Sequence, residues 1–370
     1  MKDTKETLFT PYQLGPLLLK NRLVMAPMTR NRADGQGVVP DITAQYYGQR
    51  AGAGLIITEG TNISRQAEGS PFSPGLYTPG HVAAWREVTD EVHRRNGKIF
   101  AQLWHTGRVG HSVDKNGELP VSASPLPIAD QKHYTTHGPK AYETPRALTT
   151  AEVKAVVEDY KSAAANALGA GFDGVELHGA FGYLPNQFLV DGVNHREDEY
   201  GGSIENRTRF VLEIMAALVE VWGPDRAGIK LSPSIPYNGM IDSNPEATFG
   251  FLIGKLNELP LAYLHLMQPL FPIDAFPHWP KDVLTTFGGL FDKPIMVNGG
   301  YVKDSAEQEI KTGRADLVSF GALFLANPDL PRRFALGAPL NTPDRNTFYK
   351  GGENGYTDYP FLAETEAGVQ

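Results

Sequence analysis

The sequence contains no cysteine. It therefore excludes a disulfide framework, a thiolate nucleophile, a cysteine-ligated zinc and an iron–sulfur cluster. No apolar run approaches the roughly 20 residues that span a bilayer, and residues 1–6 lack the apolar core of a secretory signal. Positive charge is not in excess, because the net charge is -8 and the pI is near 5.7. We expect a cytoplasmic protein with small-molecule partners, no nucleic acid and no membrane, as a monomer or small homo-oligomer.

Several site signatures are also missing. The sequence has no Walker A motif, no G-x-S-x-G elbow and no H-E-x-x-H, and its 10 histidines show no metal-ligand spacing. We therefore predict no metal site. Residues 169–174 (GAGFDG) match G-x-G-x-x-G, but a dinucleotide fingerprint follows a strand and opens a helix. This segment follows a predicted helix and precedes a predicted strand, so we interpret it as a tight turn.

Short apolar runs, separated by segments long enough for a helix, recur along the chain. Near-continuous hydrophobicity is typical of strands that are buried on both faces. Their repeated alternation with helices predicts a single (β/α)8 TIM barrel, with an open doubly wound sheet as the alternative. The runs are residues 22–27, 54–60, 99–105, 174–180, 227–233, 261–267, 294–300 and 317–323.

Two helices are especially clear, and two regions do not fit the repeat. Thr149 and Glu152 form a possible capping box before one apolar-periodic segment, and Ser203 opens another. Residues 106–148 follow the third strand and are rich in Gly, Pro, Ser and His, which is typical of a functional lid. Residues 341–360 form a tail after the last strand. We predict one barrel domain over 1–370, with 106–148 as an insertion within it.

Polar residues collect where the predicted strands end. Chemistry in parallel barrels occurs at the carboxyl ends of the strands, so these side chains are expected to face one site. Any one of them could instead be a hydrogen-bonded structural residue. They are Thr29, Glu59, Gln102, His105, Glu176, His178, Tyr183, Lys230 and Asn298.

Several motifs, in order, resemble signatures of the Old Yellow Enzyme family. The resemblance runs from about residue 8 to residue 360, and the tail resembles the bacterial N-ethylmaleimide reductase branch. The motifs are residues 25–30 (MAPMTR), 102–105 (QLWH), 178–184 (HGAFGYL), 200–207 (YGGSIENR), 324–330 (FLANPDL), 348–352 (FYKGG) and 355–360 (GYTDYP).

The resemblance implies FMN at the barrel mouth, reduced by NADPH or NADH, which then reduces alkenes conjugated to a carbonyl or nitro group. Such substrates are enones, enals, maleimides and nitroalkenes. By similarity, Thr29 binds a flavin carbonyl, Gln102 binds the pyrimidine edge, and Lys230 stands where the family usually has an arginine beside N1 and O2. The other implied cofactor residues are Pro27, Met28, Gly60, Asn298, Gly299, Gly300, Gly321 and Ala322.

The resemblance also implies the catalytic pair. His178 would hydrogen-bond the substrate oxygen that becomes negative, and Tyr183 would deliver a proton to the α-carbon. Phe181 and Tyr349 would line the substrate site.

The sequence departs from the family pattern at three positions. Phe181 stands where the family has a second hydrogen-bond donor, and Ser70 stands where a tyrosine is usual. Ala322 replaces the arginine that holds the FMN phosphate. Backbone N–H groups would then hold the phosphate, or another cation would, with Arg314 the first candidate before Arg332 and Arg333.

Two alternative functions remain open on the sequence. One is a degenerate family member with weak FMN binding and low activity. The other is a flavin-free barrel lyase or isomerase that uses Lys230 or Glu59.

Overall fold

The structure is a computed structural model and describes residues 7–363. Its main sheet closes into a parallel barrel, because β11 pairs with β12 on one side and with β6 on the other. Each of the predicted strands is confirmed, and the closing pair rules out the open doubly wound sheet. Around the barrel the strands are β3 (Leu23–Met25), β4 (Leu55–Ile57), β6 (Ile99–Trp104), β11 (Gly174–Gly179), β12 (Ala227–Leu231), β13 (Tyr263–Met267), β14 (Ile295–Asn298) and β15 (Leu317–Phe320).

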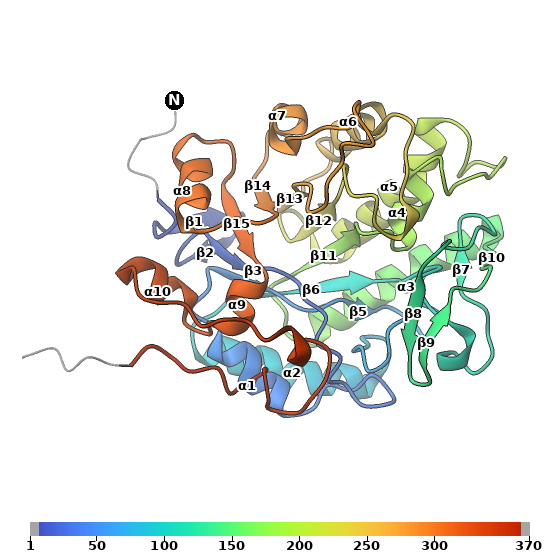
Figure 1. Ribbon diagram of the computed structural model, residues 1–370. Coiled ribbons are helices and arrows are strands. Elements are labelled where there is room, and N and C mark those ends of the chain that lie inside the picture. The colour runs from blue at the N-terminus through green and yellow to red at the C-terminus, as the bar shows by residue number, and fades with distance from the viewer. Residues whose placement is uncertain (1–6, 364–370) are drawn as a thin grey trace, which may run out of the picture.

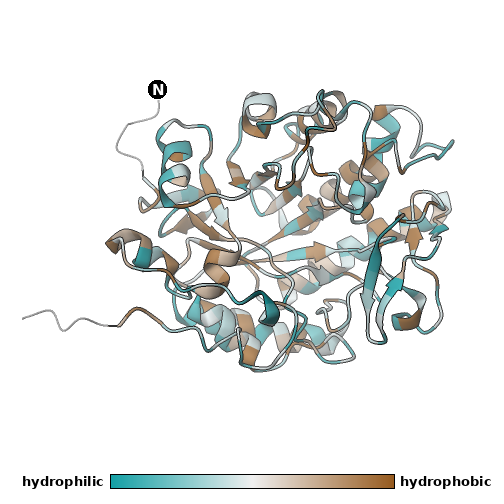
Figure 2. Cartoon of the chain, in the orientation of Figure 1, coloured by the Kyte–Doolittle hydropathy of each residue, from teal (hydrophilic) through white to brown (hydrophobic). Residues whose placement is uncertain are grey.

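Helices pack around the barrel and bury a shared apolar layer against it (Figure 1). The barrel strands carry the apolar residues that the sequence pattern required, and Figure 2 shows them largely brown. The helices are α1 (Ile42–Gln49), α2 (Pro79–Arg94), α3 (Thr150–Gly169), α4 (Leu184–Leu189), α5 (Ile204–Trp222), α6 (Pro245–Leu256), α7 (Val283–Phe287), α8 (Lys303–Lys311), α9 (Ala322–Ala326) and α10 (Leu330–Leu336). Short 3-10 turns are η1 (Ser112–Asp114), η2 (Tyr237–Gly239), η3 (Gly288–Leu290) and η4 (Arg345–Thr347).

The predicted helix signals are confirmed in detail. Thr149 and Glu152 form a reciprocal capping box at the start of α3, and the Ser203 side chain caps α5. The G-x-G-x-x-G segment is the turn from α3 to β11, where Gly171 adopts a positive φ of 83°. Only glycine adopts that conformation freely, which explains this match without a dinucleotide.

The amino-terminal end of the barrel is closed. An antiparallel hairpin of β1 (Tyr12–Leu14) and β2 (Leu17–Leu19) places Leu14, Leu17 and Leu19 in one cluster with inward-facing barrel residues such as Phe100. Access to polar groups in the barrel is therefore from the carboxyl ends of the strands, as expected for this fold.

The insertion 106–148 has secondary structure of its own. It contains β7 (Val121–Ser122), β8 (Lys132–Thr135), β9 (Gly138–Ala141) and β10 (Arg146–Ala147). The short strand β5 (Thr61–Asn62) lies outside the insertion, beside the barrel edge. β8 and β9 form a hairpin that Figure 1 places at the right, away from β1 and β2.

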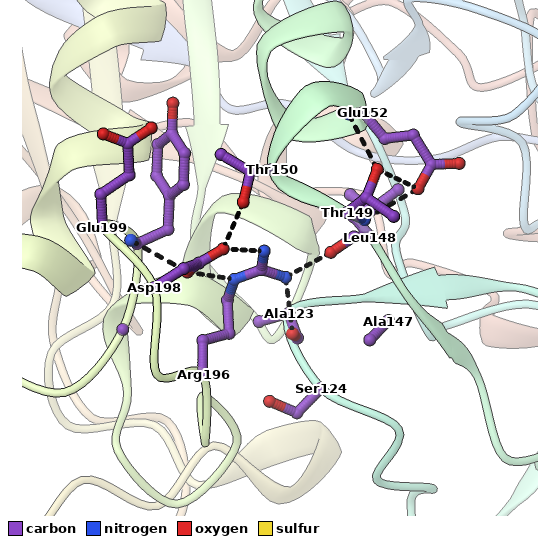
Figure 3. A network of polar contacts seen from close by, with 12 residues as sticks. Ala123, Ser124, Ala147, Leu148, Thr149, Thr150, Glu152, Arg196, Asp198 and Glu199 are labelled. Atoms are coloured by element: carbon purple, nitrogen blue, oxygen red, sulfur yellow. Dashed lines mark hydrogen bonds and ion pairs between the residues drawn. The ribbon is translucent and has the colours of Figure 1, made fainter.

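One arginine of the loop after α4 connects two points of the insertion, one within it and one at its carboxyl end. The Nη1 of Arg196 donates to the carbonyls of Ala123, at 3.1 Å, and of Leu148, at 2.5 Å. Its other nitrogens bond Asp198, which also accepts from the hydroxyl of Thr150 at 2.6 Å (Figure 3). The two ends of the segment between Ala123 and Leu148, which includes the β8–β9 hairpin, are thus fixed at one point.

The tail after α10 is held by arginines of the loop that follows β3. The rings of Tyr46 and Tyr356 stack on each other with centroids 4.0 Å apart, and the Cζ of Arg30 lies beside them, 5.0 Å from each centroid. Arg30 and Arg32 donate to backbone carbonyls of the tail, those of Thr347, Phe348, Lys350, Gly352, Asn354 and Gly355. The tail therefore lies against the first strand-to-helix loop. No helix within residues 7–363 is long and apolar enough to cross a membrane.

Candidate active site at the carboxyl ends of the strands

The barrel register brings the predicted site residues onto adjacent strands. His178 on β11 pairs with Lys230 on β12, and Lys230 pairs with His265 on β13. Gln102 on β6 pairs with Glu176. Thr29, Gly60, Asn298 and Gly321 follow or end neighbouring strands at the same end of the barrel.

His178 and Tyr183 lie against each other at this end. Their ring centroids are 4.7 Å apart, and the ring of Trp104 contacts Tyr183 at 4.9 Å and His178 at 6.3 Å. Tyr183 is the N-cap residue of α4, so the helix start fixes its backbone beside the strand that carries His178. Two groups able to donate a proton therefore share one small volume.

The protonation of this pair follows from its surroundings. Burial, with Lys230 and His265 nearby, lowers the pKa of His178 well below its usual range, so the imidazole is neutral at pH 7. Its Nδ1 accepts from the backbone N–H of Ala180 at 3.4 Å, which leaves the proton on Nε2. Burial raises the pKa of Tyr183, so its hydroxyl keeps its proton. Both are neutral hydrogen-bond donors.

Phe181 is held in a strained backbone conformation beside His178. Its φ is 57°, a left-handed value that is rare for a bulky residue. Its N–H donates to Oγ of Ser232 and its carbonyl accepts from Nδ2 of Asn238, both at 2.9 Å. Strain of this kind persists only where the surroundings enforce it and is common at functional sites.

Lys230 is a buried cation without a direct anionic partner. Its side chain is 4% exposed and makes no hydrogen bond or ion pair within the described part of the chain; its Nζ lies 5.9 Å from the Phe181 ring centroid. Burial lowers the pKa of Lys230 to about 8, although the Glu176 carboxylate opposes the fall. Such a group is poised to bind an anion.

A chain of buried hydrogen bonds below these residues connects side chains of five barrel strands. Gln102 Nε2 donates to Glu176 Oε1, and Glu176 Oε2 bonds His265 Nδ1, both at 2.8 Å. His265 Nε2 bonds Ser319 Oγ at 2.8 Å, and Asn298 Nδ2 bonds Ser319 Oγ at 2.7 Å. Sequence reasoning missed His265 and Ser319, although a lone polar residue in each otherwise apolar strand was a usable signal.

The chemistry of this end of the barrel fits a flavin. Within residues 7–363, this end of the barrel has the buried cation Lys230, a Gln102 side-chain oxygen without a hydrogen bond, and glycines that closely approach neighbouring atoms. A Cβ on Gly60 would lie 2.7 Å from the Trp104 ring, and one on Gly299 would lie 2.8 Å from Gln268 Cβ. A Cβ on Gly321 would lie 3.5 Å from Met28 Sδ, which shows that the loops after β3 and β15 adjoin.

The three arginines suggested as substitutes at Ala322 each bond other protein groups, and the partner of Arg314, Asp282, lines the cavity beside Gly299 and Gly300. Arg314 pairs with Asp282 at 2.6 Å and with Glu309 at 3.1 Å. Arg333 pairs with Asp329 and bonds the carbonyls of Pro339 and Pro360, and Arg332 bonds the carbonyl of Leu362.

A lysine that sequence reasoning missed lies near the glycine pair. Lys281 lines a cavity of about 370 Å³ together with Gln268, Gly299 and Gly300. Within residues 7–363 its ammonium has no hydrogen bond or ion pair. The sequence offered no signal for Lys281, because it belongs to the irregular loop before α7.

Other suggested residues have different surroundings. The Glu59 carboxylate accepts the backbone N–H of Arg30 at 2.9 Å, which is a structural role rather than that of a free base. Tyr349 is 62% exposed. Burial raises the pKa of Tyr183 and of Tyr237, and nearby Tyr349 raises both further. Ser70 lines a separate cavity of about 230 Å³ with Arg65 and Lys115. The described residues contain no cluster of three or more possible metal ligands.

Comparison with known families gives one match over most of the chain. The family model described as "NADH:flavin oxidoreductase / NADH oxidase family" matches residues 7–341.

Similar curated proteins cover almost the whole chain. "12-oxophytodienoate reductase 1" of Oryza sativa subsp. japonica is 44% identical over 363 residues, covering 97% of this chain and 94% of that protein. "12-oxophytodienoate reductase 2" of Arabidopsis thaliana is 41% identical over 364 residues, covering 97% and 96%.

Solved structures agree with the fold. Morphinone reductase superposes with a TM-score of 0.93 at 45% identity, covering 98% of each chain, and was also solved in complex with tetrahydroNAD. An Old Yellow Enzyme homologue from Zymomonas mobilis superposes with a TM-score of 0.92 at 40% identity, covering 96% of this chain and 100% of that one.

Proposed function

The chain belongs to the Old Yellow Enzyme family of NADH:flavin oxidoreductases, and from that premise we propose that His178 and Tyr183 carry its chemistry. The family activity is the FMN-dependent reduction, with NAD(P)H, of carbon–carbon double bonds activated by a carbonyl or nitro group. The observation that supports the assignment of the pair is the 4.7 Å contact between two neutral donors at the barrel mouth.

The two side chains have complementary roles in this reaction. Bound FMN supplies the hydride that reaches the β-carbon of the alkene. His178 donates its Nε2 proton in a hydrogen bond to the substrate oxygen, where negative charge develops, and one such donor is worth roughly 2.7–4 kcal/mol. Tyr183 transfers its hydroxyl proton to the α-carbon, which completes the addition of two hydrogens across the double bond.

FMN would be held by groups from several strands. Thr29 and Gln102 would bind the ring edges, and Lys230 would offset the negative charge that the ring carries when reduced. The backbone around Pro27, Met28 and Gly60 would pack against the ring. The residues that would surround the ribityl phosphate are Asn298, Gly299, Gly300, Gly321 and Ala322. Lys281, which makes no hydrogen bond or ion pair within residues 7–363 and shares a cavity with Gly299 and Gly300, would supply the phosphate with a cation in place of an arginine at residue 322.

The substrate side of the site is largely apolar. Phe181 and Tyr349, with Tyr237 6.5 Å from the Phe181 ring, offer aromatic surface to a substrate whose oxygen is bound by His178. The names of the relatives, oxophytodienoate and morphinone, both denote ketones. An enone is therefore the appropriate probe.

The proposal is tested with the purified protein and FMN. We expect a flavin absorbance band, and oxidation of NADPH or NADH that depends on added cyclohexenone. His178→Ala and Tyr183→Phe should each slow alkene reduction while leaving flavin bound. Full enone turnover in both variants would refute the assignment of the pair. A colourless wild type that FMN does not protect against heat would refute the cofactor site.

A further inference from the structure

Arg108, near the start of the insertion, bridges two loops that border the substrate side of the site. Its side chain is buried, at 4% exposure. Its Nη1 donates to the carbonyl of Leu126, inside the insertion, and its Nη2 donates to the carbonyl of Asn238, in the loop after β12, both at 2.9 Å. Its backbone N–H donates to Oε1 of Gln187 on α4 at 3.2 Å. One side chain therefore fastens the insertion to the loop that contains η2.

The Arg108 guanidinium is bonded only by backbone carbonyls. Within residues 7–363 no carboxylate pairs with it, and its Nε has no hydrogen bond. Burial lowers the pKa of Arg108 to about 10, so the group keeps its charge at pH 7. Burying a charge without an anionic partner is costly, so this bridge forms at the expense of stability. Local costs of this kind are expected at functional sites.

The bridge continues from Asn238 to Phe181. The Nδ2 of Asn238 donates to the Phe181 carbonyl at 2.9 Å. The two turns pack closely, because a Cβ on Gly182 would lie 2.7 Å from the Cβ of Asn238. On the other side, Nε2 of Gln187 donates to the carbonyl of Gly182 at 2.7 Å. The turn at residues 181 and 182 is therefore held from two sides.

Phe181 and Asn238 have the same unusual backbone conformation, but only one of them adopts it readily. The φ of each is 57°, in the left-handed region. Asparagine tolerates this region, whereas a bulky residue keeps it only where its surroundings enforce it. The hydrogen bonds that enforce it at Phe181 come from Ser232 and Asn238. In this conformation the Phe181 ring lies beside His178, with the ring centroids 6.4 Å apart.

We propose that Arg108 is a positioning residue, which holds Phe181 in the left-handed conformation that places its ring beside His178. It acts through Asn238. The inference rests on the proposed function, in which Phe181 lines the substrate side of the site, and goes beyond it by naming the residue that keeps that surface in place. Without the bridge, Phe181 relaxes to an ordinary backbone conformation. The substrate then binds only the fraction of molecules that still have the correct conformation, which lowers its apparent affinity.

The experiment compares Arg108→Met in two backgrounds, wild type and Phe181→Asn. Asparagine adopts the left-handed backbone without help, so a residue that acts by enforcing this conformation should lose its importance there. Reduced, FMN-loaded protein is mixed rapidly with cyclohexenone, and flavin reoxidation is followed at several enone concentrations. The concentration dependence gives the apparent Kd of the enone separately from the limiting rate.

The two backgrounds should respond differently. In the wild-type background, Arg108→Met should raise the apparent Kd about 5- to 150-fold, which is the population change that backbone strain of this kind causes, and leave the limiting rate nearly unchanged. In the Phe181→Asn background, the same change should alter the Kd by less than about threefold. An equal increase in both backgrounds overturns the proposal, as does an unchanged Kd in the wild-type background.

Arg196→Met is the matched control. Arg196 is also an enclosed arginine that donates to a carbonyl of the insertion, that of Ala123. Within the described part of the chain, however, it has no hydrogen bond to the loop after β12. Its replacement should therefore leave the apparent Kd of the enone at the wild-type value. A loss of affinity as large as that of Arg108→Met would show a general effect of loosening the insertion and would overturn the proposal.

If Arg108→Met does not fold, Asn238→Gly tests the same link. Glycine keeps the left-handed backbone and the carbonyl that Arg108 bonds, and removes the hydrogen bond to Phe181. Asn238→Gly should raise the apparent Kd of the enone in the wild-type background and leave it unchanged in the Phe181→Asn background. An unchanged Kd in the wild-type background overturns the proposal.

Hydrogen exchange of the flavin-free protein separates this inference from the proposed function. Arg108→Met, or Asn238→Gly in its place, should speed amide exchange in residues 180–184, because the turn opens more often. Arg196→Met should leave exchange there at the wild-type rate. Unchanged exchange in residues 180–184 overturns the positioning role of Arg108, whereas a wild type that does not turn over the enone refutes the proposed function.

Discussion

Replacing Lys230 with methionine should stabilise the flavin-free protein and at the same time weaken its hold on reduced FMN. The reason is the isolation of the ammonium. It is 4% exposed, and its interaction with the Glu176 carboxylate does not include a hydrogen bond or ion pair. Methionine has a similar length and no charge, so it removes the cost of burial without leaving a large cavity.

The magnitude follows from the pKa of Lys230. Burial lowers it from 10.5 to about 8, which corresponds to roughly 3 kcal/mol at about 1.4 kcal/mol for each tenfold change in the proton equilibrium. Below pH 8 both the folded and unfolded chains hold the proton, and the folded chain carries the full cost. Between about pH 8 and 10.5 only the unfolded chain keeps the proton, so stability rises with pH and the cost disappears.

The assay is urea unfolding of flavin-free wild type and Lys230→Met at pH 7 and pH 10. The variant should be more stable by about 3 kcal/mol at pH 7, and the two proteins should nearly converge at pH 10. Lys115→Met is a matched control, because burial also lowers the pKa of Lys115 to about 8. Unlike Lys230, Lys115 donates to the carbonyls of Gln66, at 2.7 Å, and Glu68, at 2.8 Å. Its loss leaves these carbonyls unpaired, so Lys115→Met should destabilise the protein at both pH values.

The flavin-loaded protein should show the opposite effect of the same change. Without Lys230, reduced FMN loses the cation that offsets its charge, so the midpoint potential should fall by tens of millivolts. Equal unfolding free energies for wild type and Lys230→Met at pH 7 would refute the reasoning, as would an unchanged potential. Equal unfolding free energies would mean that the ammonium is hydrated in the folded protein, and an unchanged potential would mean that no positive charge at Lys230 faces the flavin.

Three further predictions concern single positions. Tyr183→Phe should slow alkene reduction by about 10²- to 10⁴-fold and leave flavin reduction by NADPH unchanged, and rapid mixing separates the two half-reactions. Phe181→Asn should raise stability by about 1 kcal/mol, because asparagine tolerates the left-handed backbone, and should tighten phenol binding through a new donor; thermal melts and flavin-perturbation titrations measure both. Lys281→Met should weaken FMN by about 10- to 100-fold without affecting riboflavin, whereas Ala322→Arg should strengthen FMN alone; equal effects on both flavins would exclude a phosphate contact.

The barrel could be predicted from the sequence because burial on both faces leaves a direct pattern in the strands. The capping box at Thr149 and the cap at Ser203 join residues that are close in the sequence, so both could be predicted without knowledge of the fold. The pairing of β11 with β6, by contrast, is a long-range contact that no local pattern encodes. The prediction of a closed barrel therefore rested only on the repeated alternation of strands and helices.

The site was predicted as a set of residues but not as a network. Gln102 and Lys230 were identified at strand ends, yet the partner of each depends on the strand register. Glu176 was visible as a polar residue in an apolar run, but its link to His265 joins residues 89 positions apart. The ion pair of Arg314 with Asp282 likewise depends on packing alone.

Arg196 makes the part of the insertion between Ala123 and Leu148 replaceable as a unit. Because one guanidinium holds the carbonyls of both Ala123 and Leu148, the spacing between the two stems does not depend on the hairpin that connects them. Closing a longer or shorter loop between fixed stems changes the free energy slowly, by about 0.6 kcal/mol for each doubling of length. Hairpins of other lengths and sequences could therefore be grafted between these stems, and the rim of the barrel reshaped, while the strands beneath stay as they are.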